Sequence, residues 1–205
     1  ENYIKNELYW VLHAPRQSGK TTFLQSWASE INAKGEAVAC YVSVERCQGM
    51  GDITLSMPAI CSAIRETASA LLEKQYVPSK IDGDAGSILS LTLIDWAGKV
   101  APKPLVVLFD EVDVLRDDTM VSFLRQLRSG FATRGIGRFP VSVALVGMRD
   151  LRDYLIKSKD GVSVNPGSPF NTKEDSATMG NFSREDVQKL IAQHEEEKEQ
   201  KYFIH

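Results

Sequence analysis

Residues 14–21 read A-P-R-Q-S-G-K-T and lie between a short apolar run and a helical pattern of apolar residues. They follow the pattern G-x-x-x-x-G-K-[ST], with Ala14 at the first glycine. In this pattern, backbone N–H groups and the positive end of a helix surround phosphate groups. Gly19 permits close approach of the backbone, Lys20 reaches the β- and γ-phosphates, and the Thr21 hydroxyl ligates Mg²⁺. The predicted nucleotide contacts are Ala14, Pro15, Arg16, Gln17, Ser18, Gly19, Lys20, Thr21 and Thr22.

Two adjacent carboxylates, Asp110 and Glu111, end the apolar run Leu105–Phe109. Continuous apolar runs of this kind are typical of strands buried on both faces of a parallel sheet. The carboxyl ends of such strands are where a parallel sheet presents groups to a ligand. We therefore expect Asp110 to hold magnesium, directly or through water, and Glu111 to act as general base on the attacking water. The next acid, Asp113, is explained by a capping or loop role before Leu115.

A third polar group ends an apolar run in the segment Ala144–Asp150, which reads A-L-V-G-M-R-D. If this run is a strand of the same sheet, its polar end lies at the same edge as Asp110. Arg149 would then contact the γ-phosphate and report its presence. The alternative is a surface arginine paired with Asp150 or Asp153, and we favour the sensor role.

The elements that must position these residues follow from periodicity. Apolar runs predict buried strands at residues 9–13, 37–44, 105–109 and 141–146. Helical spacing predicts helices over 20–34, from 56 onward with Pro58 near its start, over 87–100, around 120–127 and from 183. Residues 48–56, 130–139 and 152–179 are expected to be mostly loop. Alternating strands and helices indicate an α/β fold with a parallel sheet flanked by helices.

Composition narrows the class of protein. The 205 residues carry a formal net charge of −3, whereas a dedicated nucleic-acid binder is usually strongly basic. The Arg-rich stretch from Arg116 to Arg152 is compatible with phosphate contacts and equally with a subunit interface. The odd set Cys40, Cys47 and Cys61 favours a reducing, cytoplasmic setting, and no apolar run is long enough for a membrane helix. Because the chain begins with glutamate, we expect it to be part of a longer protein.

Four motifs in order resemble the prokaryotic AAA-like ATPases, close to their origin-recognition and signal-transducing (STAND) branches. They are His13–Thr22, Asp110–Glu111, Val146–Asp150 and Ser168–Asn171. The resemblance implies a P-loop NTPase core of the ASCE/AAA type over residues 1–180, with the sensor strand between the Walker A and Walker B strands. It implies that residues 181–205 begin a helical lid or a linker to further domains. It also implies ATP and Mg²⁺ as ligands, with self-association or a protein partner.

Three functions remain open at this point. We expect an ATPase that drives or gates a conformational change in a larger protein, slow without a partner or oligomer, because the Asp110–Glu111 pair serves hydrolysis. The alternatives are a non-catalytic nucleotide-dependent switch or scaffold, and a P-loop small-molecule kinase. Oligomeric AAA-type ATPases insert an arginine from a neighbouring subunit, and Arg134 and Arg138 are the candidates in this sequence. Nucleic-acid binding would rest on fold-level likeness alone.

Overall fold

The computed structural model describes residues 4, 6–13, 15, 17–135 and 137–147, with the short pieces 156–157, 163–164, 175–178, 180, 185–186 and 188–189. Of the region 181–205, residues 185–186 and 188–189 are helical, and the rest lies outside the described residues. The motif Ser168–Asn171 lies outside them too.

A five-stranded parallel sheet forms the centre of the molecule, with the order β2-β3-β4-β1-β7. Its strands are β1 (Tyr9–His13), β2 (Val38–Ser43), β3 (Leu105–Asp110), β4 (Ser142–Gly147) and β7 (Asp175–Thr178). The predicted position of the sensor strand is confirmed, since β4 lies between β3 and β1. The sequence did not predict β7, because D-S-A-T is a polar segment without an apolar run.

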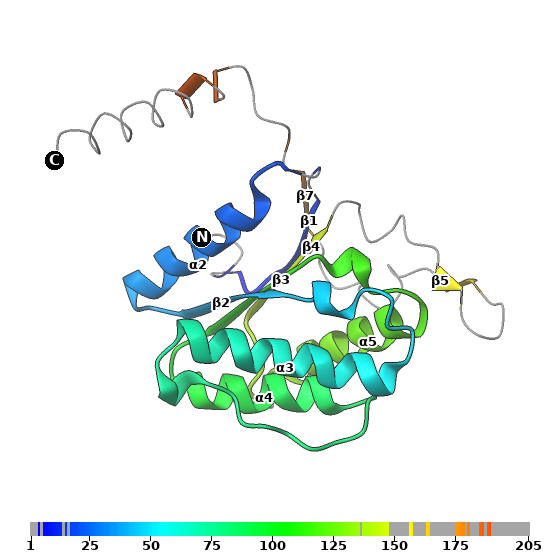
Figure 1. The fold of residues 1–205 in the computed structure, drawn as a ribbon. Coiled ribbons are helices and arrows are strands. Elements are labelled where there is room, and N and C mark those ends of the chain that lie inside the picture. The colour runs from blue at the N-terminus through cyan, green and yellow to red at the C-terminus, as the bar shows by residue number, and fades with distance from the viewer. Residues whose placement is uncertain are drawn as a thin grey trace, which may run out of the picture.

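Within the described residues, four helices cover the two faces of the sheet unequally. They are α2 (Lys20–Lys34), α3 (Ile53–Leu71), α4 (Ile88–Val100) and α5 (Asp117–Thr133). Figure 1 shows α2 on one face and α3, α4 and α5 together on the other. Short 3₁₀ turns occur at η1 (Glu45–Cys47), η2 (Lys74–Tyr76) and η3 (Val112–Val114), and β5 (Ile156–Lys157) pairs with β6 (Ser163–Val164).

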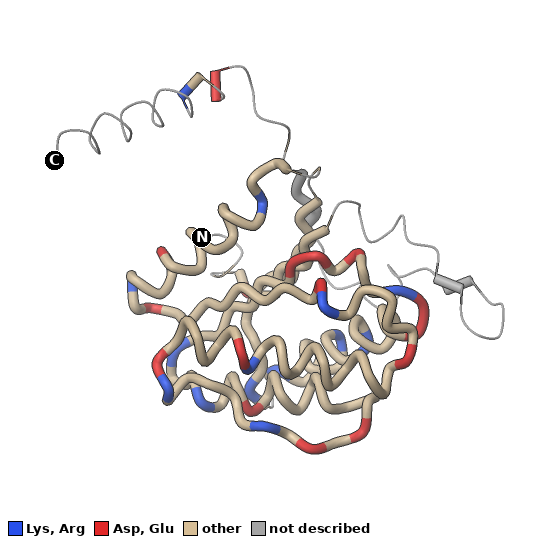
Figure 2. Tube along the Cα trace, in the orientation of Figure 1, with Lys and Arg blue, Asp and Glu red and all other residues tan. Residues whose placement is uncertain are grey.

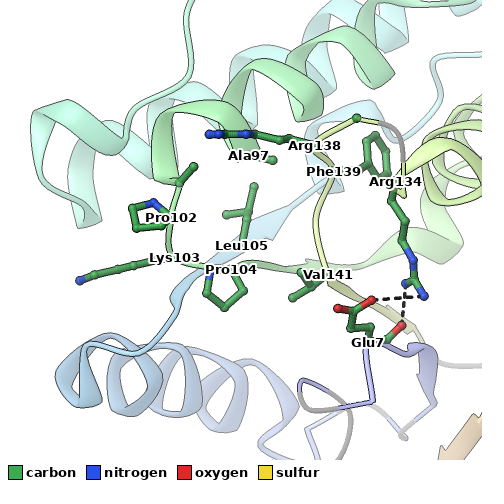
Figure 3. A pocket seen from close by; sticks show the side chains of 12 residues that line it. Glu7, Ala97, Pro102, Lys103, Pro104, Leu105, Arg134, Arg138, Phe139 and Val141 are labelled. Carbon is green, nitrogen blue, oxygen red and sulfur yellow. Dashed lines mark hydrogen bonds and ion pairs between the residues drawn. The ribbon is translucent and has the colours of Figure 1, made fainter.

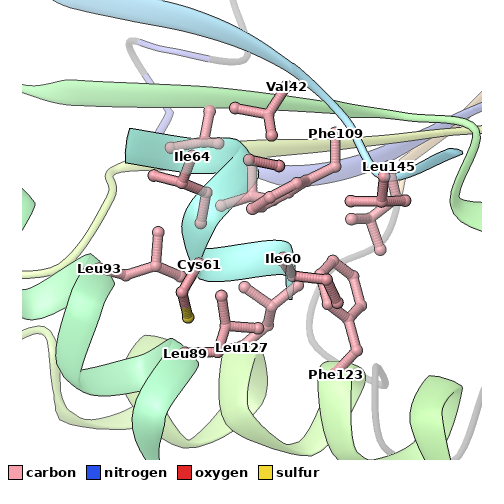
Figure 4. Close-up of a cluster of buried hydrophobic side chains, with 14 of the residues drawn as sticks. Val42, Ile60, Cys61, Ile64, Leu89, Leu93, Phe109, Phe123, Leu127 and Leu145 are labelled. Atoms are coloured by element: carbon pink, nitrogen blue, oxygen red, sulfur yellow. The ribbon is translucent and has the colours of Figure 1, made fainter. Parts of the chain in front are cut away.

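The alternation of side chains along each strand divides the core into two clusters. In β3, Leu105, Val107 and Phe109 pack with the α3–α5 layer, where Figure 4 shows Phe109 beside Ile60 and Phe123. Val106 and Leu108 pack with the α2 cluster on the other face. Asp110 follows Val106 and Leu108 in this alternation. Its fully buried carboxylate at the end of β3 therefore lies on the face of the sheet that α2 covers.

Several predicted boundaries were wrong for identifiable reasons. Helix α3 begins at Ile53 rather than at 56, because the Asp52 carboxylate accepts a hydrogen bond from the Thr54 N–H at 2.8 Å and caps the helix earlier. Pro58 therefore lies inside the helix. Helix α5 continues to Thr133, through part of the expected loop 130–139.

All three cysteines are free and buried. Burial raises the pKa of the Cys40 thiol to about 12, which keeps it protonated and unreactive at neutral pH. Among the helices that the structure describes, none has the length and apolar character needed to cross a membrane.

Candidate functional site

Two residues of the loop between β1 and α2 have a left-handed backbone conformation. Gln17 and Gly19 both adopt positive φ angles, 60° and 77°. The Ser18 hydroxyl donates to the Pro15 carbonyl at 2.9 Å, which ties the loop to itself. Helix α2 starts at Lys20 with no acidic residue in its first turn, so its positive end stays available to an anion.

The buried Asp110 carboxylate joins this loop to the sheet. Its Oδ2 atom accepts hydrogen bonds from the Thr21 hydroxyl at 2.8 Å and from the Tyr41 hydroxyl at 3.2 Å. Its Oδ1 atom accepts from the Glu111 backbone N–H at 2.9 Å. Because an unpaired buried charge is costly, these three donors explain how a carboxylate with no exposed surface is tolerated here.

Lys20 and Glu111 form the second contact of the site. The Lys20 ammonium lies 3.2 Å from the Glu111 Oε1 atom, with 8% and 31% of the two side chains exposed. Glu111 has a φ angle of 60°, in the left-handed region that non-glycine residues enter at a cost of about 1–2 kcal/mol. Strain of this kind collects at functional sites, so the turn after β3 has the local signature of one.

Tyr41 was not among the sequence-predicted site residues. Burial raises the pKa of its hydroxyl to about 12, and the negative charge of Asp110 adds to that effect, so the phenol keeps its proton and donates. One signal could have identified it. Alternation along β2 places Tyr41 on the same face as Ala39, which packs with the α2 cluster. The missing information was the register between β2 and β3.

The oxygen atoms at this edge fit a magnesium ion. The Thr21 hydroxyl and the Asp110 carboxylate lie 2.8 Å apart, and hard cations take oxygen ligands. Within the described part of the chain, His, Cys, Asp and Glu side chains do not form a group of three that could hold a metal. Few protein ligands are typical of Mg²⁺ bound together with substrate phosphates rather than in an all-protein cage.

Of the predicted site residues, the structure brings together Lys20, Thr21, Asp110 and Glu111. The loop beside them contains Pro15, Gln17, Ser18 and Gly19. Thr22 is exposed on α2. Ala14, Arg16 and Arg149 lie outside the described residues. Figure 2 shows red acidic segments at the turns after β2 and β3, at the same edge of the sheet, with a blue basic segment directly beside the one after β2.

A family model for the AAA domain matches residues 4–155. The chain belongs to the AAA domain family. It is an AAA-type P-loop ATPase domain, and nucleotide binding is a property of that class. No curated protein sequence matches the chain.

Several solved structures share the fold of this AAA domain, and their chains are longer than this one. Cdc6p from Pyrobaculum aerophilum matches with a TM-score of 0.60 and 15% identity over 93% of this chain and 45% of its own. The Walker-type ATPase of Pyrococcus abyssi matches with a TM-score of 0.56 and 14% identity, over 90% of this chain and 52% of its own. A chain of the Drosophila ORC assembly with poly(dA/dT) DNA and Cdc6 matches with a TM-score of 0.53 and 9% identity, over 93% of this chain and 29% of its own. The chain therefore spans about half or less of these structures, which share its fold.

Asp113 does not cap α5 in this AAA domain. The residue before α5 is Arg116, and Asp113 lies in η3 against Gly147 at the end of β4. A Cβ atom at Gly147 would come within 2.9 Å of the Asp113 Oδ1 atom, so only glycine fits without a shift. This buried oxygen has no hydrogen-bond partner among the described residues.

Arg134 and Arg138 line a cavity of about 360 Å³ at the amino ends of the strands, the edge opposite the P-loop (Figure 3). Arg134 donates to the Glu7 carbonyl at 2.8 Å, lies 3.4 Å from the Glu7 carboxylate and covers the Phe131 ring. Arg138 donates to the Gly98 carbonyl at 3.4 Å. Neither arginine is near the P-loop of its own AAA domain, so their assignment as fingers acting in a neighbouring subunit stays a prediction.

Proposed function

We propose that this AAA domain binds ATP with magnesium at the carboxyl edge of its sheet and hydrolyses it. The observation that carries the proposal is the 2.8 Å hydrogen bond between Thr21 and Asp110, which lie 89 residues apart in the chain. It brings a hydroxyl, a carboxylate and the next residue, Glu111, into one place beside Lys20. A nucleotide-binding scaffold without hydrolysis would have no need of a second carboxylate there.

Each residue has a distinct role in this proposal. The loop from Ala14 to Thr22 and the positive end of α2 surround the phosphates, and Lys20 neutralises the β- and γ-phosphates. Thr21 and Asp110 hold Mg²⁺, which offsets phosphate charge when it is bound. Glu111 orients the attacking water and accepts its proton, and Arg149 senses the γ-phosphate.

The ion pair between Lys20 and Glu111 gives the site an order of events. As ATP binds, Lys20 exchanges the Glu111 carboxylate for phosphate oxygens, which are stronger and more numerous acceptors. The Glu111 carboxylate is then released to face the water that attacks the γ-phosphate. ATP binding thus frees Glu111 to act as the general base. Without ATP, the Glu111 carboxylate is paired with Lys20.

Hydrolysis is proposed to drive or gate a conformational change in a larger protein. We place the division of the chain between residues 180 and 181, with residues 181–205 beginning a helical lid or linker. A second copy or another protein completes the site, because an arginine acting across an interface is the usual source of transition-state charge in oligomeric ATPases. DNA is part of the Drosophila ORC assembly that shares the fold, but the net charge of −3 does not favour it as a partner here.

The test is phosphate release at saturating Mg·ATP over a range of protein concentrations. The parent, Glu111→Gln, Lys20→Ala and the matched control Glu45→Gln would be compared; Glu45 is an exposed acid that follows the neighbouring strand β2. We expect release that needs Lys20 and Glu111 but not Glu45, and that rises per subunit with concentration. Tight Lys20-dependent ATP binding with no release at any concentration would contradict hydrolysis and indicate a nucleotide-dependent switch.

A further inference from the structure

The Asp110 Oδ2 atom has a second donor that the proposed chemistry does not use. Besides the Thr21 hydroxyl at 2.8 Å, it accepts the Tyr41 hydroxyl at 3.2 Å. The other carboxylate oxygen accepts the Glu111 N–H at 2.9 Å. The carboxylate is therefore held on both oxygens, and Tyr41 is the side chain that holds it from β2.

Tyr41 reaches Asp110 because of the register of the two strands. Ser43 lies opposite Asp110 and Tyr41 lies opposite Leu108, two residues earlier on the same face. The Tyr41 side chain also packs against the apolar cluster under α2, which holds Leu108 and Leu24. A packed aromatic ring has few rotamers, so the position of its hydroxyl is determined by the core of the domain.

We propose that Tyr41 is a positioning residue for the divalent cation, acting through Asp110. The inference rests on the proposed function, because it assumes that Thr21 and Asp110 are the protein ligands of magnesium. Outer-shell partners that orient a ligating side chain are general features of metal sites. The Tyr41 hydroxyl keeps Asp110 Oδ2 directed towards the Thr21 hydroxyl, which is the geometry that the ion needs.

The Tyr41→Phe substitution removes the hydroxyl and leaves the ring in the core. Loss of an outer-shell partner costs roughly 10–100-fold in metal affinity. We therefore expect the affinity for the cation to fall by about 10-fold, at the lower end of that range, because Thr21 and the Glu111 N–H still hold the carboxylate. Nucleotide binding without any divalent cation should not change, because the Tyr41 hydroxyl interacts with the side chains of Asp110 and Thr21, the expected ligands of the cation.

A matched control exists in the same sheet. The Tyr9 hydroxyl donates to the Pro140 carbonyl at 3.2 Å, at the opposite edge from the P-loop. Tyr9→Phe removes the same group from another β-strand and breaks another buried hydrogen bond. It should lower thermal stability to a similar extent and leave cation affinity at the parent value.

The experiment measures Mn²⁺ binding by electron paramagnetic resonance with a non-hydrolysable ATP analogue present, and analogue binding in EDTA by calorimetry. The parent, Tyr41→Phe and Tyr9→Phe would be compared on the full chain, with thermal unfolding of each. The expected result is weaker Mn²⁺ binding in Tyr41→Phe alone, with equal analogue affinity in EDTA for all three. Unchanged Mn²⁺ affinity in Tyr41→Phe, or an equal loss of analogue affinity in EDTA, would overturn the role of Tyr41.

The same measurements separate this inference from the proposed function. If the parent binds Mn²⁺ with the analogue but releases no phosphate from ATP, hydrolysis is contradicted while the test of Tyr41 remains complete. If the parent binds no Mn²⁺ with the analogue, the magnesium site is contradicted and the role of Tyr41 is overturned with it.

Discussion

The two ends of the parallel sheet carry charge in different ways. At the carboxyl edge two of the charged groups are buried: Asp110 has no exposed surface and Lys20 is 7% exposed, while Glu111 beside them is partly exposed. At the amino edge the ion pair between Glu7 and Arg134 is partly exposed, with 53% and 28% of the two side chains open to solvent. Aromatic side chains pack beside it, with the Tyr9 and Phe131 ring centroids 4.6 Å apart. Because burial of charge is costly, the carboxyl edge is organised for binding and the amino edge for stability.

Lys20→Ala should have the largest effect at the carboxyl edge. Loss of the ammonium that neutralises the phosphates is expected to weaken ATP binding by at least about 100-fold, with little change in the melting temperature. Calorimetric titration with ATP measures this, and Lys34→Ala is the control, because Lys34 is an exposed lysine of the same helix paired with Glu30. ATP affinity that survives in Lys20→Ala would remove the distinction between the two edges.

Gly130→Ala should have the largest effect at the amino edge. A Cβ atom at Gly130 would lie 2.1 Å from the Phe139 ring, so the core there must shift. Overpacking of this kind costs about 1–3 kcal/mol, which thermal or urea unfolding would detect. ATP affinity should stay at the parent value, because the change lies away from the P-loop.

The control for Gly130→Ala is Gly98→Ala on α4. Apart from the neighbouring residues and the surrounding backbone of α4, no described atom lies within 4 Å of a Cβ atom built at Gly98. Alanine is favoured over glycine inside a helix by about 1 kcal/mol, so this variant should be more stable than the parent. Equal destabilisation by both substitutions would contradict the packing account of the amino edge.

Glu111→Gln should have a smaller effect on binding, in the opposite direction from Lys20→Ala. Without the carboxylate, Lys20 no longer has to leave an ion pair when ATP arrives. Partly exposed ion pairs contribute about 0.2–1 kcal/mol, so ATP affinity should rise by no more than about fivefold. Calorimetric titration with ATP at low and high salt tests this, because the gain in ATP affinity should shrink as salt screens the Lys20–Glu111 ion pair of the parent. Weaker ATP binding in Glu111→Gln would contradict the proposal that Lys20 exchanges Glu111 for phosphate.

Glu7→Gln should have the smallest effect. It removes the exposed ion pair with Arg134 but leaves the bond from Arg134 to the Glu7 carbonyl. The expected loss of stability is less than about 1 kcal/mol and should disappear in 1 M salt, with no change in ATP binding. A loss that persists in high salt would mean that the amino edge also depends on charge.

The local patterns predicted the P-loop, the acidic pair at the end of β3 and the main strands, because apolar runs and the Gly19–Thr21 spacing contain that information directly. The position of β4 between β3 and β1 was implied by the family resemblance and not by a local pattern. The contact between Tyr41 and Asp110 depends on strand register, which no local pattern encodes. The packing of Gly130 against Phe139 likewise depends on how α5 meets the segment before β4, which periodicity along one helix does not specify.

The central claim is that Glu111 prepares water for attack on ATP bound by Lys20 and Thr21. The most direct test is to incubate the parent and Glu111→Gln with Mg·ATP below the protein concentration, separate the protein, and identify the bound nucleotide by chromatography. The account predicts ADP on the parent and intact ATP on Glu111→Gln after the same interval. Equal amounts of ADP on both proteins would contradict it.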